Sequence, residues 1–168
     1  MSISHRKTAT IWNYIWQPLI ILIFLFSILN LFYHTAQSDI LWAVGAGSLA
    51  SSAFIIFSKP SSVTAHPLRL IVAYVIAILC GMLLHIMGET LLYAGHSFVW
   101  LSFLASIAVI VCLYFMFWLN VEHPPAVGMA LVFVIDLKDY RTSVLIIAAI
   151  TLLVVIKLIL NRKLSDLF

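Results

Sequence analysis

Residues 98–119 read FVWLSFLASIAVIVCLYFMFWL, an apolar run without a single charged side chain. About 20 apolar residues in a helix cross the hydrocarbon core of a bilayer, so this run predicts a transmembrane helix. Three more runs of similar character lie along the chain, at Pro18 to Tyr33, Leu68 to Met87 and Ser143 to Leu160. The chain is therefore expected to cross a membrane several times.

The composition of the whole chain agrees with this interpretation. Apolar residue types make up 64% of the 168 residues and charged types only 9%, against roughly 45–50% and roughly 25% in ordinary soluble domains. Because a soluble fold cannot bury so much apolar surface, we expect one transmembrane domain over residues 1–168 and no soluble domain. The net charge of +3 is small, and the lysines and arginines are scattered along the chain. Both observations argue against a nucleic-acid partner. The expected surroundings are the lipid bilayer.

Two further segments differ from these runs. Residues 40–57 are long enough to cross but carry glycine, alanine and serine in their middle, whereas residues 124–137 are apolar but number only 14. Such a short segment makes a helix of about 21 Å, less than the roughly 30 Å hydrocarbon core. We expect these segments to form two unusual helices, the second and fifth in the chain.

The lysines and arginines decide whether these two segments cross. With six crossings and a cytoplasmic N-terminus, seven basic residues lie on or near the inner side, and Lys138 and Arg141 lie outside. The seven are Arg6, Lys7, Lys59, Arg69, Lys157, Arg162 and Lys163. If neither segment crosses, the bias weakens to five against four. The predicted topology is thus six membrane segments in the cell inner (plasma) membrane, with both termini cytoplasmic.

The order of the segments repeats after the third one. Each half, about residues 11–92 and about residues 97–163, contains a long helix, an unusual segment and another long helix. An odd number of crossings per half inverts the second half relative to the first. The tripeptide Ala-Val-Gly occurs in both unusual segments, at 43–45 and 126–128. We therefore predict an all-α helical bundle built as a 3+3 inverted repeat with short helices 2 and 5, a pattern that points to a transport site at the bilayer midplane.

The run His123-Pro124-Pro125 precedes the fifth segment. Proline lacks an N–H and disfavours helix in the residue before it, but it is tolerated at a first helical turn. An extended stretch is therefore expected to end at His123, with a helix starting at Pro124. Non-helical backbone inside a membrane is tolerated only against protein or a watery cavity, so this helix start is a candidate site.

Two blocks of the chain resemble the HPP family of integral membrane proteins, which is named for its His-Pro-Pro motif. One block is His123 to Ala126 with Gly128, Ala130 and Leu131, and the other is Gly47, Ser48, Ser52, Phe57, Pro60, Ser62 and Ala65 to Pro67. The chain departs from the family's pattern at residues 66–69, which read His-Pro-Leu-Arg where Gln-Pro-Arg is expected. Some plastid and cyanobacterial members are linked to nitrite transport, so the resemblance implies a pathway for a small anion.

A physical version of this idea rests on the helix start. Unpaired N–H groups and the positive end of the helix dipole suit a small anion there, and His123 adds charge when protonated. The predicted pathway residues are His123, Pro124, Pro125, Gly128, Gly45, Ser48, Ser51 and Ser52, and the predicted entry vestibule consists of Lys59, His66 and Arg69. The alternatives are close helix packing for the small residues, a helix cap for Glu122 and His123, and a plain cytoplasmic loop for the vestibule.

Metal, cofactor and catalytic sites are not expected. His85 and Glu89 lie four residues apart on one helix face, but two ligands do not make a metal site, and His96 reaches them only by folding back. Cys80 and Cys112 lie in apolar runs and are interpreted as packing residues. The sequence contains no nucleotide-binding, zinc-protease or nucleophile-elbow motif.

These observations favour a channel or carrier for a small inorganic anion, with nitrite the best single guess, through a midplane site formed by the starts of the two short helices. The alternatives are an accessory subunit of a larger membrane complex and a membrane-embedded enzyme. Homo-oligomerisation and the choice between channel and carrier are left open.

Overall fold

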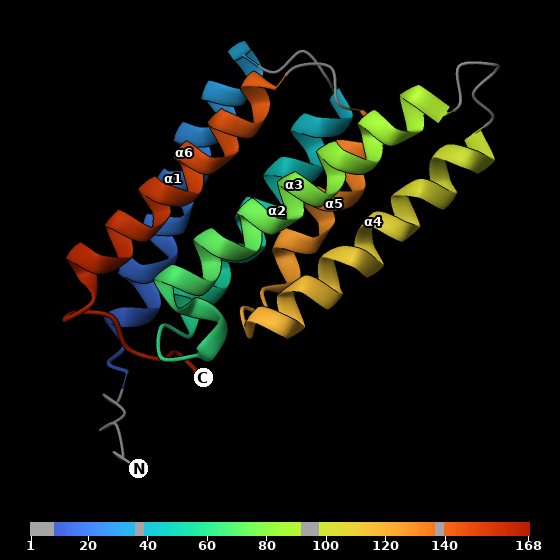
Figure 1. Ribbon diagram of the computed structural model, residues 1–168. Helices are drawn as coiled ribbons and strands as arrows, with labels where there is room; N and C mark the ends of the chain where they lie inside the picture. Colours follow the sequence, from blue (N-terminus) through green and yellow to red (C-terminus); the bar gives the residue numbers. More distant parts are fainter. Residues whose placement is uncertain (1–8, 36–38, 92–97, 137–139) are drawn as a thin grey trace.

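The computed structural model describes residues 9–35, 39–91, 98–136 and 140–168. Over these residues the fold is entirely helical and contains no strand, which confirms the all-α prediction. The helices are α1 (Asn13–Thr35), α2 (Asp39–Ser58), α3 (Pro67–Leu91), α4 (Phe98–Leu119), α5 (Pro124–Ile135) and α6 (Arg141–Leu160), and the 3₁₀ turn η1 (Val63–Ala65) joins α2 to α3 (Figure 1).

Four of the helices, α1, α3, α4 and α6, are long and apolar enough to cross a bilayer. They coincide with the four predicted spans. Of the two helices expected to be short, only α5 is, with 12 residues, whereas α2 has 20 residues, as many as α6. The small residues of α2 do not end it, because backbone in lipid has to satisfy its own hydrogen bonds.

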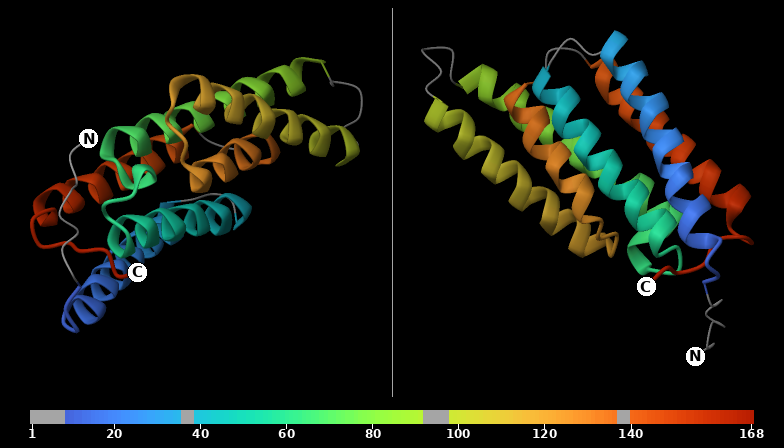
Figure 2. Two further views of the ribbon diagram at one scale, coloured as in Figure 1. Left: turned by 90° about the horizontal axis from the view of Figure 1, so that it is seen from below. Right: turned by 180° about the vertical axis from the view of Figure 1, so that it is seen from behind.

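The short helix α5 lies in the middle of the bundle, packed against α2, α3 and α4 (Figures 1 and 2). The other helix contacts join α1 to α2, α3 to α4, α3 to α6, α2 to α6 and α1 to α6. If α1, α2 and α3 are matched with α4, α5 and α6, the contact α1–α2 matches α4–α5, α3–α5 matches α2–α6, and α3–α4 matches α1–α6. The pairs α2–α5 and α3–α6 match themselves. The helices α1 and α4 run in opposite directions (Figure 1).

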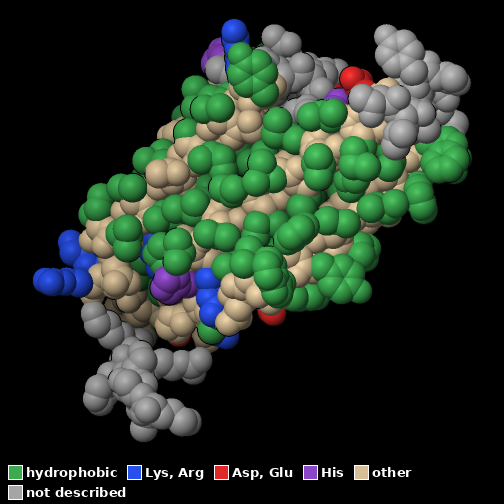
Figure 3. Space-filling view, in the orientation of Figure 1, with side chains coloured by type: hydrophobic (Ala, Val, Ile, Leu, Met, Phe, Trp, Pro, Cys, Tyr) green, Lys and Arg blue, Asp and Glu red, His purple; other side chains and the backbone are tan. Residues whose placement is uncertain are grey.

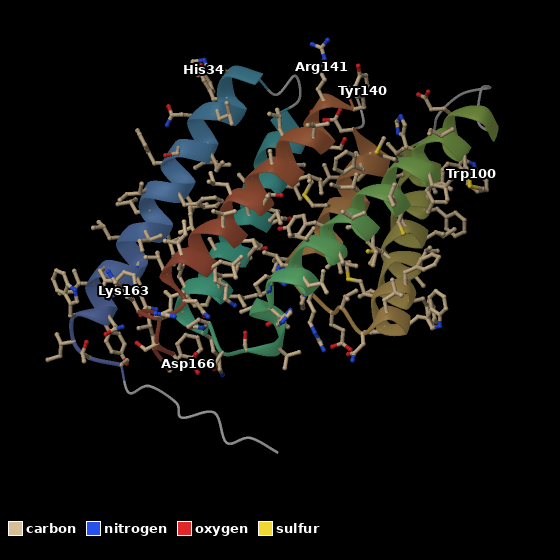
Figure 4. All side chains as sticks on the ribbon, turned by 60° about the vertical axis from the view of Figure 1, so that its left-hand side comes forward. His34, Trp100, Tyr140, Arg141, Lys163 and Asp166 are labelled. Carbon is tan, nitrogen blue, oxygen red and sulfur yellow. The ribbon has the colours of Figure 1, made fainter. Side chains whose placement is uncertain are left out.

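The start of α1 and the C-terminal segment lie at the same end of the bundle. The Asn13 Nδ2 atom donates to the Ser165 Oγ atom at 2.6 Å, and the Gln17 Nε2 atom donates to the Ser165 carbonyl at 3.1 Å. Figure 4 places Lys163 and Asp166 at this end and His34, Tyr140 and Arg141 at the opposite end.

The face of the bundle shown in Figure 3 is apolar between these ends. Large side chains such as Trp100 and Trp118 on α4 and Phe26 on α1 are at least half exposed. A surface of this kind is stable only in lipid. The protein is therefore a multi-pass α-helical membrane protein.

The two ends should be reached from opposite sides of the membrane. We expect a water-soluble thiol reagent to label Ser61→Cys from the cytoplasmic face and Tyr140→Cys from outside, because lysine and arginine concentrate at the end that holds Ser61. The native Cys80 and Cys112 are buried and should not compete. Labelling of both positions from one side, or with the sides exchanged, would contradict the predicted topology.

A candidate anion site at the His-Pro-Pro helix start

The linker between α4 and α5 begins with a tight helix end. Asn120 has φ 53°, the left-handed conformation that asparagine tolerates better than most residues. The Asn120 N–H donates to the Phe117 carbonyl and the Val121 N–H to the Met116 carbonyl, both at about 3 Å. These are the two bonds of a Schellman motif, and buried Val121 and Met116 supply its apolar contact. The chain thus turns sharply back towards the bundle before the His-Pro-Pro motif.

The motif itself starts α5, as predicted. His123 is extended, with φ −145° and ψ 90°, and Pro124 and Pro125 occupy the first two helical positions. Prolines have no N–H, and the third position, Ala126, donates its N–H to the His123 carbonyl at 3.0 Å. The expectation of unpaired N–H groups at this helix start is therefore wrong for the first three positions. An anion here would feel the helix dipole but would need side chains as donors.

The imidazole of His123 is at the centre of a buried hydrogen-bonded cluster. Its Nδ1 atom lies 3.0 Å from the Thr64 carbonyl and its Nε2 atom 2.8 Å from the Ser52 Oγ atom, which lies 2.9 Å from the Tyr74 hydroxyl. Ser52, Tyr74 and His123 are at most 1% exposed. We refer to these three side chains and the Thr64 carbonyl as the polar cluster. It joins α2, α3, η1 and the linker before α5.

The partners of His123 define its tautomer. A carbonyl only accepts, so Nδ1 carries the proton and donates to Thr64. In the neutral ring Nε2 accepts from the Ser52 hydroxyl, and the Ser52 oxygen accepts from the Tyr74 hydroxyl. His123 lies in the linker, outside the helices, and burial lowers its pKa from the ordinary value, a change that the bond to Thr64 partly opposes. The ring is therefore neutral near neutral pH.

The other predicted pathway residues divide between the two faces of α2. Gly45, Ser48 and Ser52 are buried on one face. A Cβ atom added at Gly128 of α5 would lie 3.3 Å from the Ser48 Oγ atom, so α2 and α5 approach closely there. Ser51 instead is exposed, and its hydroxyl donates to the Gly47 carbonyl of the same helix. The structure thus brings Ser48, Ser52, Gly128 and His123 together and leaves Ser51 outside the group.

Two of the predicted vestibule residues, Lys59 and His66, are the first and last residues of the loop between α2 and α3, and Arg69 lies in the first turn of α3. The Lys59 Nζ atom lies 5.5 Å from the centre of the Phe168 ring, and the Arg69 Nη1 atom lies 3.5 Å from the Asn120 Oδ1 atom. His66 is exposed. These three residues lie at the same end of the bundle as the linker before α5, which is compatible with an entry vestibule. The vestibule itself stays a prediction.

A cavity of about 380 Å³ opens beside the same linker, between α4 and α5. Glu122 and His123 form its polar edge, and its walls are otherwise apolar. Pro124 is also part of its wall, whereas Pro125 is half-buried. The cavity gives the region around His123 an opening on the bundle surface.

The pair His85 and Glu89, considered above as metal ligands, lies elsewhere, and His96 falls outside the described residues. The His85 Nε2 atom lies 3.8 Å from Glu89, while its Nδ1 atom is 2.9 Å from the Val134 carbonyl. In the part of the chain that the structure describes, no three His, Cys, Asp or Glu side chains group as metal ligands do. Cys80 and Cys112 are free and buried in the core.

Three buried polar residues were not predicted from the sequence as site residues. Tyr74 completes the polar cluster, Lys157 of α6 is 4% exposed beside the η1 loop, and Gln17 of α1 donates to the Phe57 carbonyl. For Tyr74 and Lys157 the sequence contains a signal that could have identified them. A tyrosine inside an apolar run needs a hydrogen-bond partner when buried, and a lysine there is costly enough to suggest a specific role.

The fold and this site define a class: multi-pass α-helical membrane proteins with a buried polar cluster at a His-Pro-Pro helix start. The chain belongs to the HPP family, because the family described as "HPP, transmembrane region" matches residues 6–166, nearly its whole length. The resemblance found in the sequence is thereby confirmed. No curated protein and no solved structure matches the chain.

Proposed function

We propose that the protein is a channel or carrier for a small inorganic anion and not an enzyme, with nitrite the first candidate because of the family resemblance. One observation carries the proposal. The buried hydroxyls of Ser48 and Ser52 on α2 face Gly128 and His123 at the start of α5, within a bundle whose buried side chains are mostly apolar. Polar groups at such a position are costly and mark pathways in membrane proteins. Hydroxyls and a neutral imidazole N–H donate hydrogen bonds without holding an anion too tightly for release.

The helix contacts support a site between inverted halves. Each helix contact has a counterpart under the exchange of halves, as in a 3+3 inverted repeat, although α3–α5 and α3–α4 are much more extensive than their counterparts α2–α6 and α1–α6. In such a repeat α2 and α5 meet on the two-fold axis near the midplane. The two Ala-Val-Gly tripeptides lie on these helices and approach each other, since a Cβ atom at Gly128 would be 4.0 Å from the Val44 side chain. We propose that six segments cross the inner membrane and that the anion passes between α2 and α5.

The passage is closed in the conformation described. The Ser52 hydroxyl donates to His123 Nε2, and His123 Nδ1–H donates to the Thr64 carbonyl, so the two donors become available to an anion only when both bonds open. A closed resting conformation is compatible with gated transport by a channel or a carrier.

Flux in liposomes tests the proposal. We expect the purified protein to move nitrite, and Ser52→Ala to reduce the rate about tenfold, the change that corresponds to about 1.4 kcal/mol. The matched control is Ser51→Ala, one residue away on the exposed face of α2, which should leave the rate unchanged. Chloride and nitrate flux in the same vesicles measure selectivity.

Two results would overturn the proposal. If the wild-type protein moves no anion when reconstituted alone, the accessory-subunit hypothesis replaces it. If Ser51→Ala and Ser52→Ala reduce flux equally, the passage does not run along the buried face of α2.

A further inference from the structure

The loop between α2 and α3, residues 59–66, is held by three segments that are distant in sequence. At its start, the Ser61 N–H donates to the Asp166 carboxylate at 3.0 Å, and the Leu167 N–H donates to the Ser58 carbonyl at 2.8 Å. At its end, within η1, the carbonyls of Thr64 and Ala65 accept from His123 and Lys157. All of these partners belong to the second half of the chain or to the C-terminal segment.

Lys157 is the most unusual of these partners. It lies in the last turn of α6, only three residues from the helix end, where a long lysine side chain ordinarily extends to the membrane surface. Here the side chain is instead 4% exposed, and its Nζ atom donates to the Ala65 carbonyl and, at 3.1 Å, to the Pro60 carbonyl. The ammonium thus bridges both ends of the loop. The Asp166 carboxylate is close enough to interact with it electrostatically.

The position of the loop relates this contact to the proposed passage. Thr64 and Ala65 are consecutive, so Lys157 holds the peptide next to the one that His123 holds. His123 in turn bonds to Ser52, one turn along α2 from Ser48. The loop therefore packs against the basic ends of α2 and α3 and reaches the start of α5 through His123, and it cannot leave this position without breaking the bonds to Lys157.

We infer that Lys157 is a positioning residue of the passage: it latches the loop 59–66 as a gate over the basic end of the space between α2 and α5. The inference rests on the proposed passage. Opening the gate exchanges the two carbonyl partners of Lys157 for water, and it frees the Thr64 carbonyl and His123 from each other. The ammonium that is released then lies at the mouth of the passage, where its charge favours an anion.

Thiol accessibility tests the latch without requiring transport. Ser48→Cys places a thiol on the buried face of α2, and a water-soluble thiosulfonate reagent is added from the cytoplasmic side. We expect slow labelling in this parent protein and labelling faster by about tenfold or more with Lys157→Met, because two hydrogen bonds to the loop are lost. Lys157→Arg keeps a charged donor for the carbonyls and should restore slow labelling.

The control is Lys163→Met, which removes an exposed positive charge at the same end of the bundle and should not change the rate. If Lys157→Met does not fold, Lys157→Gln keeps N–H donors on a neutral side chain and should give an intermediate rate. Equal rates in the parent and in a folded Lys157 variant would overturn the inference, as would an equal acceleration by Lys163→Met.

Nitrite flux of the same variants separates this inference from the proposed function. Faster labelling of Ser48→Cys together with faster nitrite flux in Lys157→Met supports both. Faster labelling without nitrite flux in any variant supports the gate and overturns the anion proposal. Nitrite flux that depends on Ser52, with labelling unaffected by Lys157, supports the passage and overturns the gate.

Discussion

Replacing Gly81 by alanine is expected to destabilise the bundle more than the same change at Gly47, Gly88 or Gly128. A Cβ atom at Gly81 of α3 would lie 2.5 Å from the Phe133 Cβ atom and 2.7 Å from the Ala130 carbonyl oxygen of α5. Neither atom is at the end of a flexible side chain, so α3 and α5 have to move apart. The helix α5 has little room to move, because it also packs against α2 and α4. Overpacking of this kind costs about 3 kcal/mol or more, or roughly 10 °C in melting temperature.

Thermal unfolding in detergent measures this effect against two matched controls. Gly47→Ala adds its methyl to open space on the exposed side of α2 and should stabilise the helix by up to about 1 kcal/mol. Gly88→Ala meets only the Cδ1 atom of Leu104, at 2.8 Å, and a rotation of that side chain can relieve the contact. If Gly81→Ala melts at the temperature of Gly47→Ala, the close approach of α3 and α5 is wrong.

The second large effect is expected from His123→Ala. The substitution removes both bonds of the ring and leaves the Ser52 hydroxyl and the Thr64 carbonyl without this partner. A buried group that loses its partner costs about 1–3 kcal/mol, so we expect a loss of about 2–4 kcal/mol and no anion flux. His123→Asn places its amide near Nδ1 and His123→Gln near Nε2, so each should retain one bond and melt between the wild type and His123→Ala. Equal melting of His123→Ala and the wild type would show that the cluster does not hold the helices together.

The pH dependence of the same residue has a defined sign. The folded pKa of His123 is lowered by burial, so the unfolded chain binds a proton that the folded chain does not. The contribution of His123 to stability is therefore complete above the unfolded value of about 6.5 and is lost as the pH falls below it. A protonated ring attracts an anion, so we expect flux to rise as the pH falls. This rise should occur at pH values below those at which an ordinary histidine titrates, because the folded pKa of His123 is lowered.

His123→Gln separates this titration from other effects. It should remove the acid-dependent rise in flux and reduce the acid-dependent loss of stability. Pro125→Ala perturbs helix entry without changing charge, so it should lower flux at every pH and leave the shape of the profile unchanged. If His123→Gln keeps both the flux and its pH profile, His123 is a helix cap and not part of the passage.

The sequence by itself determined the lipid-spanning character, the four long spans and the start of α5 at Pro124. Each follows from a local constraint: a bilayer requires long apolar helices, and two consecutive prolines fit a helix only at its first turn. The sequence did not determine the length of α2, which has 20 residues where a short helix was predicted. Glycine and serine weaken a helix in water but are tolerated where no water competes for the backbone.

Only the tertiary structure decided which face of each helix points inward. In a soluble protein the polar side of a helix identifies its outer face, but in a bilayer both the lipid-facing and the core-facing sides are apolar, so periodicity carries little information. For this reason Ser51 and Ser52 looked equivalent in the sequence, although one is exposed and the other bonds to His123. From the sequence, Lys157 was likewise interpreted only as an orientation signal at a helix end. Its role in the fold is not visible there, because only the folded loop brings the carbonyls of Pro60 and Ala65 to its ammonium.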